Sequence, residues 1–556
     1  MKKQYLILTL LMVFIAFNTS AQTRYVDAIY TDADIEVTSG VDYGTNIDFL
    51  TSTTSNQANV GRDITEIKTA LGTGQAIPAK YFDARDASTD LKVTTVKMDI
   101  YQPKASVDAT TDRPVVVYLH TGNFLPPRIN GSPNGFKGDS SAIVLCTEWA
   151  KRGYVAVAVN YRLGWNPLAE QADVRRGQLL NAVYRAIHDT KEAIRNLKDN
   201  ANTYGIDGDK IVLYGEGTGA YVALAYETLD KNEEMELEKF RAGGVGPSYI
   251  DRTIVGEIDG SGGLLNLYGT STTSVEVAAI VAAGGALADT SWLEAGDAPM
   301  ISFHSVRDAF APFSEGTVIV PTTNEDVVDV QGGNLYVQKA NSLGNNDAIK
   351  NIKANDAYTA AARALYGQEV DYIYPAPFNK ITINTEVEGL YPVLLPVADE
   401  VLNNQASPWQ WWDTESPLAK HELAPGFTTS MNSLQSNPDM SSEKGRTYID
   451  TIMGYMCPRI ALINGDIDIS LLYSNELIPS NAASVYPNPS TGNLSINIEN
   501  AYRVLDVKIT DLTGRVVMNL SAMNNQTVNI ADLTAGYYFI NVAAEEGNIS
   551  TKLLKQ

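Results

Sequence analysis

One stretch of the chain has the spacing of a catalytic turn but lacks the reactive atom. Residues 211–214 are an apolar run, and residues 215–219 (Gly-Glu-Gly-Thr-Gly) form a glycine-spaced turn that leads into a helical pattern. A strand, a sharp turn and a helix are the context of a nucleophile elbow, whose signature is G-x-S-x-G. Gly215 and Gly219 fill the outer glycine positions, whereas the apex is Gly217. The turn is therefore predicted to have the framework for a serine nucleophile without its hydroxyl.

Two other hydroxyl groups lie near enough in sequence to be weighed as displaced nucleophiles. Thr218 follows the apex directly, where a threonine more often caps the amides of the first helical turn. Ser261 lies in a glycine-rich segment that has neither the upstream glycine nor the strand–helix context of an elbow. Glycine at the apex also relieves about 1–3 kcal/mol of backbone strain, which favours a turn that no longer carries out catalysis.

A general base is equally hard to find, because the chain has only four histidines. His120, His188 and His304 are predicted to be structural, from their places in a loop, in mid-helix and at the end of a strand. Only His421 follows Asp308, as the order nucleophile, acid, base requires. His421 is therefore the one candidate base.

The elements that would position these residues alternate between strands and helices. Several strand patterns are apolar throughout, which suits strands buried on both faces of a parallel sheet. We predict a mostly parallel sheet with helices on both faces; its clearest strands are residues 113–120, 154–160, 211–214, 275–283 and 300–305. A separate small β-sandwich is predicted from the short alternating strands after Val485.

The predicted organisation has four parts. Residues 1–21 combine two lysines, an apolar run and small residues at a cleavage position, which is typical of a signal peptide. Residues 22–462 form the α/β domain, residues 463–483 a linker, and residues 484–556 the β-sandwich. No later segment is apolar for long enough to predict a transmembrane helix.

Composition narrows the classes of partner and cofactor. The net charge of −23 disfavours nucleic acid and anionic lipid as partners. No metal-ligand constellation and no phosphate-binding glycine loop appears, so no cofactor and no metal are expected. Cys146 and Cys457 lie in helical patterns, and an exported protein would allow them to form a disulfide if those helices are neighbours; two separate buried thiols are the alternative.

Several motifs occur in the order found in a known family. They are His120–Phe124 (H-T-G-N-F), Tyr161–Gly164 (Y-R-L-G), Arg185–Asp189 (R-A-I-H-D), the elbow, and Pro299–Pro312 with His304 and Asp308. With this set, the chain resembles the carboxylesterase-like α/β-hydrolases, although Thr121 and Asn123 stand where that family has glycine. The resemblance implies an α/β-hydrolase fold with Asp308 at the acid position and an oxyanion hole formed by the amides of Thr218 and of Gly122 or Asn123. The base of this family usually follows the next strand, and residues 388–392 are interpreted as a remnant of that loop.

The C-terminal part resembles the type A sorting domain of the type IX secretion system of Bacteroidetes. The resemblance is carried by Tyr486–Gly492 (Y-P-N-P-S-T-G), Ala535–Tyr538 and Lys552–Lys555. It implies that the secretion machinery is a partner and that the protein is secreted or held at the cell surface.

Three readings of the α/β domain remain open at this point. The first is a non-catalytic relative of carboxylesterases that binds a small ester, acyl or glycan-linked ligand in the cleft that corresponds to the active site of that family. The second is an active carboxylic ester hydrolase with a displaced nucleophile, and the third is a structural cell-surface protein.

Overall fold

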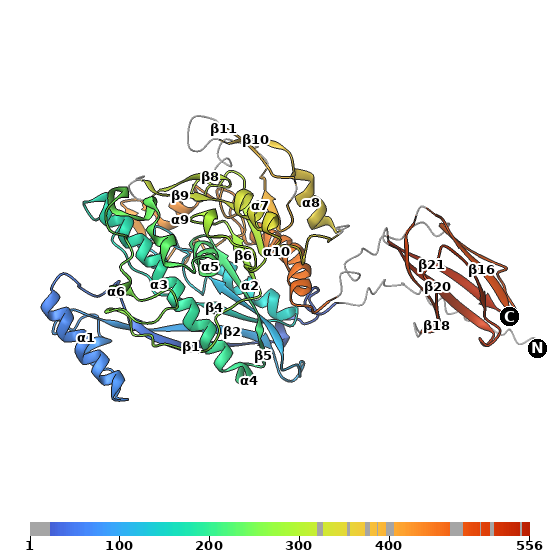
Figure 1. Cartoon of the computed structure of the whole chain (residues 1–556), viewed down its shortest axis with the longest axis horizontal. Helices are drawn as coiled ribbons and strands as arrows, with labels where there is room; N and C mark the ends of the chain where they lie inside the picture. The colour runs from blue at the N-terminus through green and yellow to red at the C-terminus, as the bar shows by residue number, and fades with distance from the viewer. Residues whose placement is uncertain are drawn as a thin grey trace, which may run out of the picture.

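The computed structural model describes residues 23–319, 326–352, 356–372, 379–385, 387–395, 405–467, 482–500, 502–511, 516–544 and 547–556. The predicted signal peptide and most of the predicted linker lie outside these residues. The centre of the larger part is a β-sheet (Figure 1). This sheet has eight strands, in the order β1-β2-β4-β3-β5-β6-β7-β12. Its strands are β1 Ile35–Ile47, β2 Val93–Pro103, β3 Arg113–Leu119, β4 Val155–Val159, β5 Ile206–Glu216, β6 Ala279–Ala283, β7 Met300–Ser305 and β12 Leu390–Val393.

All strand pairs from β4 to β12 are parallel, whereas β1 and β2 join the sheet antiparallel. The predicted fold class, a mostly parallel sheet with helices on both faces, is therefore confirmed. The helices of this part are α1 Gln57–Gly72, α2 Ser140–Lys151, α3 Ala172–Asp199, α4 Ala201–Tyr204, α5 Thr218–Thr228, α6 Arg252–Val255, α7 Gly333–Leu343, α8 Ala357–Leu365, α9 Thr429–Ser433 and α10 Ser442–Ile463.

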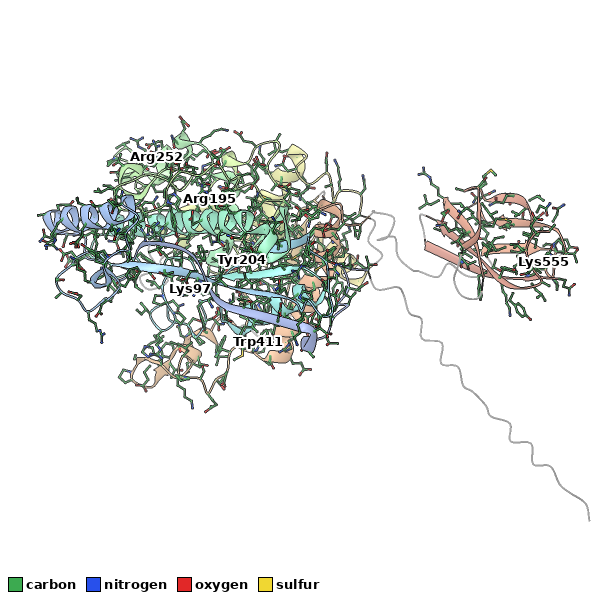
Figure 2. The ribbon with its side chains drawn as sticks, turned by 90° about the horizontal axis from the view of Figure 1, so that it is seen from below. Lys97, Arg195, Tyr204, Arg252, Trp411 and Lys555 are labelled. Atoms are coloured by element: carbon green, nitrogen blue, oxygen red, sulfur yellow. The ribbon has the colours of Figure 1, made fainter. Side chains whose placement is uncertain are left out.

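Two apolar layers cover the sheet, one on each face. Along β3, Val115, Val117 and Leu119 join the layer that includes α3 and α5, whereas Val116 and Tyr118 join the layer of α2 and α10. This alternation is the period-two geometry of a strand buried on both faces. In Figure 2, Arg195 of α3 and Trp411 lie on opposite sides of the strands, as their two layers require.

In the described part of this domain, three two-stranded hairpins lie outside the central sheet. They are β8 Glu315–Ile319 with β9 Asp326–Gln331, β10 Glu369–Tyr372 with β11 Asn379–Thr382, and β13 Glu422–Ala424 with β14 Phe427–Thr428.

Seven further strands form the C-terminal unit, drawn in red in Figure 1. One sheet has the order β15-β16-β19 and the other β18-β17-β20-β21, all antiparallel. Their bounds are β15 Ala483–Tyr486, β16 Asn493–Ile498, β17 Val504–Asp511, β18 Val516–Leu520, β19 Asn525–Asn529, β20 Gly536–Ala544 and β21 Gly547–Lys555. A core of their own, with Ile496, Val507 and Ile540 among its members, fills the space between the sheets.

The predicted disulfide is wrong. Cys146 on α2 and Cys457 on α10 do belong to neighbouring helices in one apolar layer, but both are free thiols. The Cys457 sulfur instead packs 3.8 Å from the sulfur of Met453. Burial raises the pKa of the Cys457 thiol to about 11, and it raises that of Cys146 further, which disfavours the thiolate needed for disulfide exchange.

Candidate functional site

The turn between β5 and α5 has the conformation of a nucleophile elbow. Gly217 at its apex has φ 53° and ψ −115°, a backbone that is strained for any residue with a Cβ. A Cβ on Gly215 would overlap the carbonyl of Gly219, and a Cβ on Gly219 would overlap that of Leu119. The Gly217 N–H donates to the carbonyl of Ala283 on β6 at 2.8 Å. The turn is therefore locked in place, and only the serine side chain is missing from it.

The loop after β3 lies over this apex. A Cβ built on Gly217 would overlap Thr121 Oγ1 and lie 3.0 Å from Thr121 Cβ. Thr121 thus occupies the space that a side chain at the apex would need. The sequence singled out Thr121 only as a departure from the family's glycine, and it did not show that this side chain meets the elbow.

The predicted oxyanion loop has an unusual backbone. Positive φ angles occur at Gly122 (119°), Asn123 (55°) and Phe124 (54°), and such a backbone costs residues with a Cβ about 1–3 kcal/mol each. Hydrogen bonds hold the loop: Trp165 Nε1 donates to the Asn123 carbonyl at 2.7 Å, and the Gly164 N–H donates to that of Phe124 at 2.9 Å. Within the described residues, the amides of Gly122 and Asn123 donate no intramolecular hydrogen bond.

A cavity of about 620 Å³ opens above the elbow. Of the predicted site residues, Gly217, Thr218, Asn123 and Asp308 line it, whereas Gly122 and His421 do not. One wall is apolar and the other carries uncharged polar side chains. The apolar wall includes Leu179, Leu180, Val183, Ile187, Tyr221, Ala225, Leu229, Met235, Phe240, Trp292, Val318, Val327 and Val330. The polar wall includes Asn130, Ser132, Ser407, Gln410, Asn432, Ser433, Gln435, Ser436 and Asn437.

Asp308, the predicted acid, lies in the loop after β7. Its Oδ1 accepts hydrogen bonds from the N–H groups of Phe310 at 2.7 Å and Ala311 at 2.9 Å. Burial outweighs these two bonds and raises the pKa of Asp308 to about 7. Asp308 is the only ionisable carboxyl, amine or guanidinium group among the described residues that line the cavity.

The histidine nearest Asp308 cannot act as its partner base. His304 Nε2 lies 3.8 Å from Asp308 Oδ2, but this nitrogen donates to the Ala311 carbonyl at 2.9 Å. The other nitrogen, Nδ1, accepts from the N–H of Gly333 at 3.2 Å. Burial lowers the pKa of His304 to about 4. Both ring nitrogens of His304 are thus engaged in hydrogen bonds to the backbone, and the His304 side chain does not line the cavity.

The other histidines are also placed away from the site. His120 Nδ1 donates to the Thr121 carbonyl at 2.6 Å, and the ring stacks on Tyr161 with 4.4 Å between centroids. His188 is buried in α3, and burial lowers its pKa well below the ordinary range. His421 is exposed in the loop before β13. None of the four histidines, all of which the structure describes, lines the cavity.

The connection from β12 to α10, which follows the next strand of the central sheet after Asp308, also lines the cavity. It returns to the cavity with Ser407 and Gln410, and Gln410 Nε2 donates to Glu216 directly before the apex. The Ser305 hydroxyl donates to the carbonyl of Ala406 at 2.7 Å and holds this segment in place. Serine, glutamine and asparagine side chains, rather than an imidazole, therefore line the cavity from the described part of this connection.

Residues 388–392 are not a remnant of the base loop, contrary to the sequence-based interpretation. Glu388 precedes β12, so it lies at the opposite end of the parallel strands from the elbow. Its buried carboxylate pairs with Arg459, and with Arg363 at 3.0 Å. Glu388 is thus part of a structural ion-pair cluster.

The two displaced nucleophiles weighed from the sequence are not placed for attack. The Thr218 hydroxyl is buried beside the Tyr161 hydroxyl. Ser261 does not line the cavity, and its hydroxyl donates to Asp259 at 2.8 Å. No group of three or more histidine, cysteine, aspartate or glutamate side chains suited to a metal ion occurs among the described residues.

Comparison with known families covers both parts of the chain. The family model "BD-FAE" matches residues 98–244, a range that contains the predicted oxyanion loop and the elbow. The model described as "Secretion system C-terminal sorting domain" matches residues 484–556. None of the helices in the described part of the chain has the length and hydropathy needed to cross a bilayer.

Individual relatives match shorter stretches. Lipase 2 of Geotrichum candidum is 26% identical over 180 residues, which cover 31% of this chain and 30% of the lipase. The neuroligin-like protein glit-1 of Caenorhabditis elegans is 31% identical over 123 residues, covering 22% of this chain and 14% of that protein. This chain thus spans less than a third of the length of either relative.

Among solved structures, Thermogutta terrifontis esterase 2 phosphorylated by paraoxon matches with 19% identity and a TM-score of 0.27, over 45% of this chain and 75% of that one. The order of the strands in the sheet, the conformation of the elbow and the two family matches all indicate the same two-domain organisation. The chain combines an esterase- and lipase-like α/β-hydrolase domain with a type IX secretion system sorting domain, which directs it to the cell surface or the medium.

Proposed function

We propose that the α/β domain binds a small uncharged ester or acyl compound, free or linked to a glycan, and does not hydrolyse it. The observation that carries this proposal is the cavity itself. It lies over an elbow whose apex is Gly217, and no histidine lines it. Removal of a catalytic serine or histidine costs about a million-fold in rate in a well-studied protease, so the loss of both leaves binding as the remaining use of the cavity.

The side chains that line the cavity support an uncharged ester or acyl compound as its ligand. A ligand with an acyl or aryl arm would bury it against the apolar wall, at about 25 cal/mol per Å² of apolar surface. Its polar end would meet the asparagine, serine and glutamine side chains of the other wall, which match hydroxyl and carbonyl groups. No lysine or arginine of the described residues lines the cavity, which disfavours a carboxylate or phosphate group on the ligand.

The two alternatives have less support. An active hydrolase needs a hydroxyl with a base within hydrogen-bond reach, and neither Thr218 nor Ser261 has an imidazole there. A purely structural role gives no reason for a cavity of about 620 Å³ with a divided lining.

Fluorescence titration tests the proposal, because Trp165, Trp292 and Trp412 all line the cavity. We expect octyl glucoside, below its micelle concentration, to give a saturable change, and octanoate to bind more weakly at about pH 8, where Asp308 is ionised. Ala225→Phe fills the apolar wall and should weaken octyl glucoside binding at least about tenfold. The control, Ala361→Phe on the exposed side of α8, should bind normally. Absence of saturation in the natural protein, or equal binding by Ala225→Phe, would contradict the proposal.

A further inference from the structure

The contact between Thr121 and the elbow links two departures from the family pattern. At the apex a side chain is missing, and in the facing loop a side chain stands where the family has glycine. The Thr121 hydroxyl oxygen would overlap a Cβ on residue 217, and Thr121 Cβ lies 3.0 Å from the position of that Cβ. Ordinary contacts between carbon atoms are about 3.5–4.0 Å. The two departures are therefore sterically coupled.

The loop cannot easily move aside. Tyr161 Oη donates to the His120 carbonyl at 2.6 Å, directly before Thr121. Directly after it, Gly122 packs so closely that an added Cβ would lie 2.7 Å from Gly135 Cα. Rotation about χ1 would move the Thr121 hydroxyl, but Thr121 Cβ would remain too close.

We infer that Thr121 and Gly217 form a reciprocal pair: the Thr121 side chain fills the space of the missing serine, and its hydroxyl donates a hydrogen bond to a carbonyl oxygen of the ligand. The second half of this statement rests on the proposed function. This hydrogen bond would make Thr121 a residue that binds an ester without attacking it.

Three observations support the hydrogen bond from the Thr121 hydroxyl to the ligand, which we call the ligand half of the inference. Thr121 lines the cavity and is partly exposed. Its hydroxyl has no hydrogen-bond partner among the described residues, so it is available to a ligand. Asn123, whose amide donates no intramolecular hydrogen bond in the described chain, lines the same part of the cavity. Attack by the Thr121 hydroxyl would need a base to accept its proton, and no described group accepts one from it.

A double-mutant cycle tests the steric half of the inference, which is that the Thr121 side chain fills the space of a side chain at residue 217. Gly217→Ala should lower the Tm of the α/β domain by about 1–3 °C, and by less than half as much when Thr121→Gly is also present. Gly284→Ala is the matched control, because Gly284 also has a positive φ (72°) but its added Cβ would have no neighbour closer than 3.6 Å. Its effect should add to that of Thr121→Gly. Additive effects of Gly217→Ala and Thr121→Gly would overturn the steric half.

Binding of methyl octanoate and of methyl octyl ether, which lacks the carbonyl, tests the ligand half by tryptophan fluorescence. We expect the natural protein to bind the ester about three- to tenfold more tightly, as one hydrogen bond provides. Thr121→Val should bind the ester and the ether with equal affinity, and Thr121→Ser should retain the preference for the ester.

The outcomes separate the two proposals. If ester and ether bind equally and Thr121→Val changes neither, the carbonyl contact is refuted and the proposed function stands. If neither compound binds, the proposed function fails, and the ligand half fails with it. An acyl group found on Thr121 by mass spectrometry after incubation with the ester would show attack and overturn the inference.

Discussion

Replacing the buried acid Asp308 by asparagine should change how the stability of the α/β domain depends on pH. Asp308 is almost fully buried, and burial raises its pKa from an ordinary 3.8 to about 7. Asparagine has nearly the same shape and remains neutral at every pH. The difference in stability between the two proteins therefore isolates the titration of this one carboxyl group.

The sign follows from proton binding. Between pH 3.8 and about 7 the folded protein holds the proton of Asp308, whereas the unfolded chain has lost it. The stability that this proton provides is fully present below pH 3.8 and is lost as the pH rises through about 7. Each pH unit in this window changes the free energy of unfolding by about 1.4 kcal/mol, so the whole window amounts to about 4 kcal/mol.

Urea unfolding of the natural protein and of Asp308→Asn, from about pH 4.5 to about pH 8.5, measures this difference. All six tryptophans lie between Trp149 and Trp412, so their fluorescence reports on the α/β domain alone. Relative to Asp308→Asn, the natural protein should lose about 3 kcal/mol over this range, mostly below pH 7.5. The exposed Asp112→Asn is the control, and we expect its curve to run parallel to that of the natural protein.

Two results would refute the reasoning. Parallel curves for the natural protein and Asp308→Asn would mean that burial does not hold the proton on this carboxyl. A natural protein that gains stability relative to Asp308→Asn as the pH rises would mean that the ionised form is the one the site stabilises.

Three further predictions concern other parts of the α/β domain. Gly217→Ser should not react with a fluorophosphonate probe, because no histidine lines the cavity; labelling above that of the natural protein would contradict this. Cys146 and Cys457 should be unreactive toward Ellman's reagent in the native protein, and both should react after denaturation without a reductant. Arg459→Met should lower the free energy of unfolding by about 3–5 kcal/mol, since it leaves the buried Glu388 without its main partner; urea unfolding that shows a loss under about 1 kcal/mol would be inconsistent with the ion pair.

The sequence was informative about the fold because the strands of the central sheet are apolar on both faces. Runs such as Val115–Leu119 and Ile211–Tyr214 are typical of buried parallel strands, and they became β3 and part of β5. The glycine spacing of the elbow was equally readable, because backbone contacts at Gly215 and Gly219 leave no room for a Cβ.

The site was less predictable, because it depends on contacts between distant segments. The Thr121 side chain meets Gly217 only through the packing of β3 beside β5. His421 was chosen by its order in the chain, and order does not show that its loop leads away from the cavity. The disulfide failed for a similar reason: neighbouring helices do not by themselves bring two sulfur atoms into bonding geometry.

Hydrolysis of 4-nitrophenyl butyrate by the purified natural protein tests the central claim most directly. With no serine at residue 217 and no histidine lining the cavity, we expect release of nitrophenol no faster with the protein than with Thr121→Val or Ala225→Phe at equal concentration. Turnover proportional to the concentration of the natural protein, and lost in either variant, would show that the cavity is an active site.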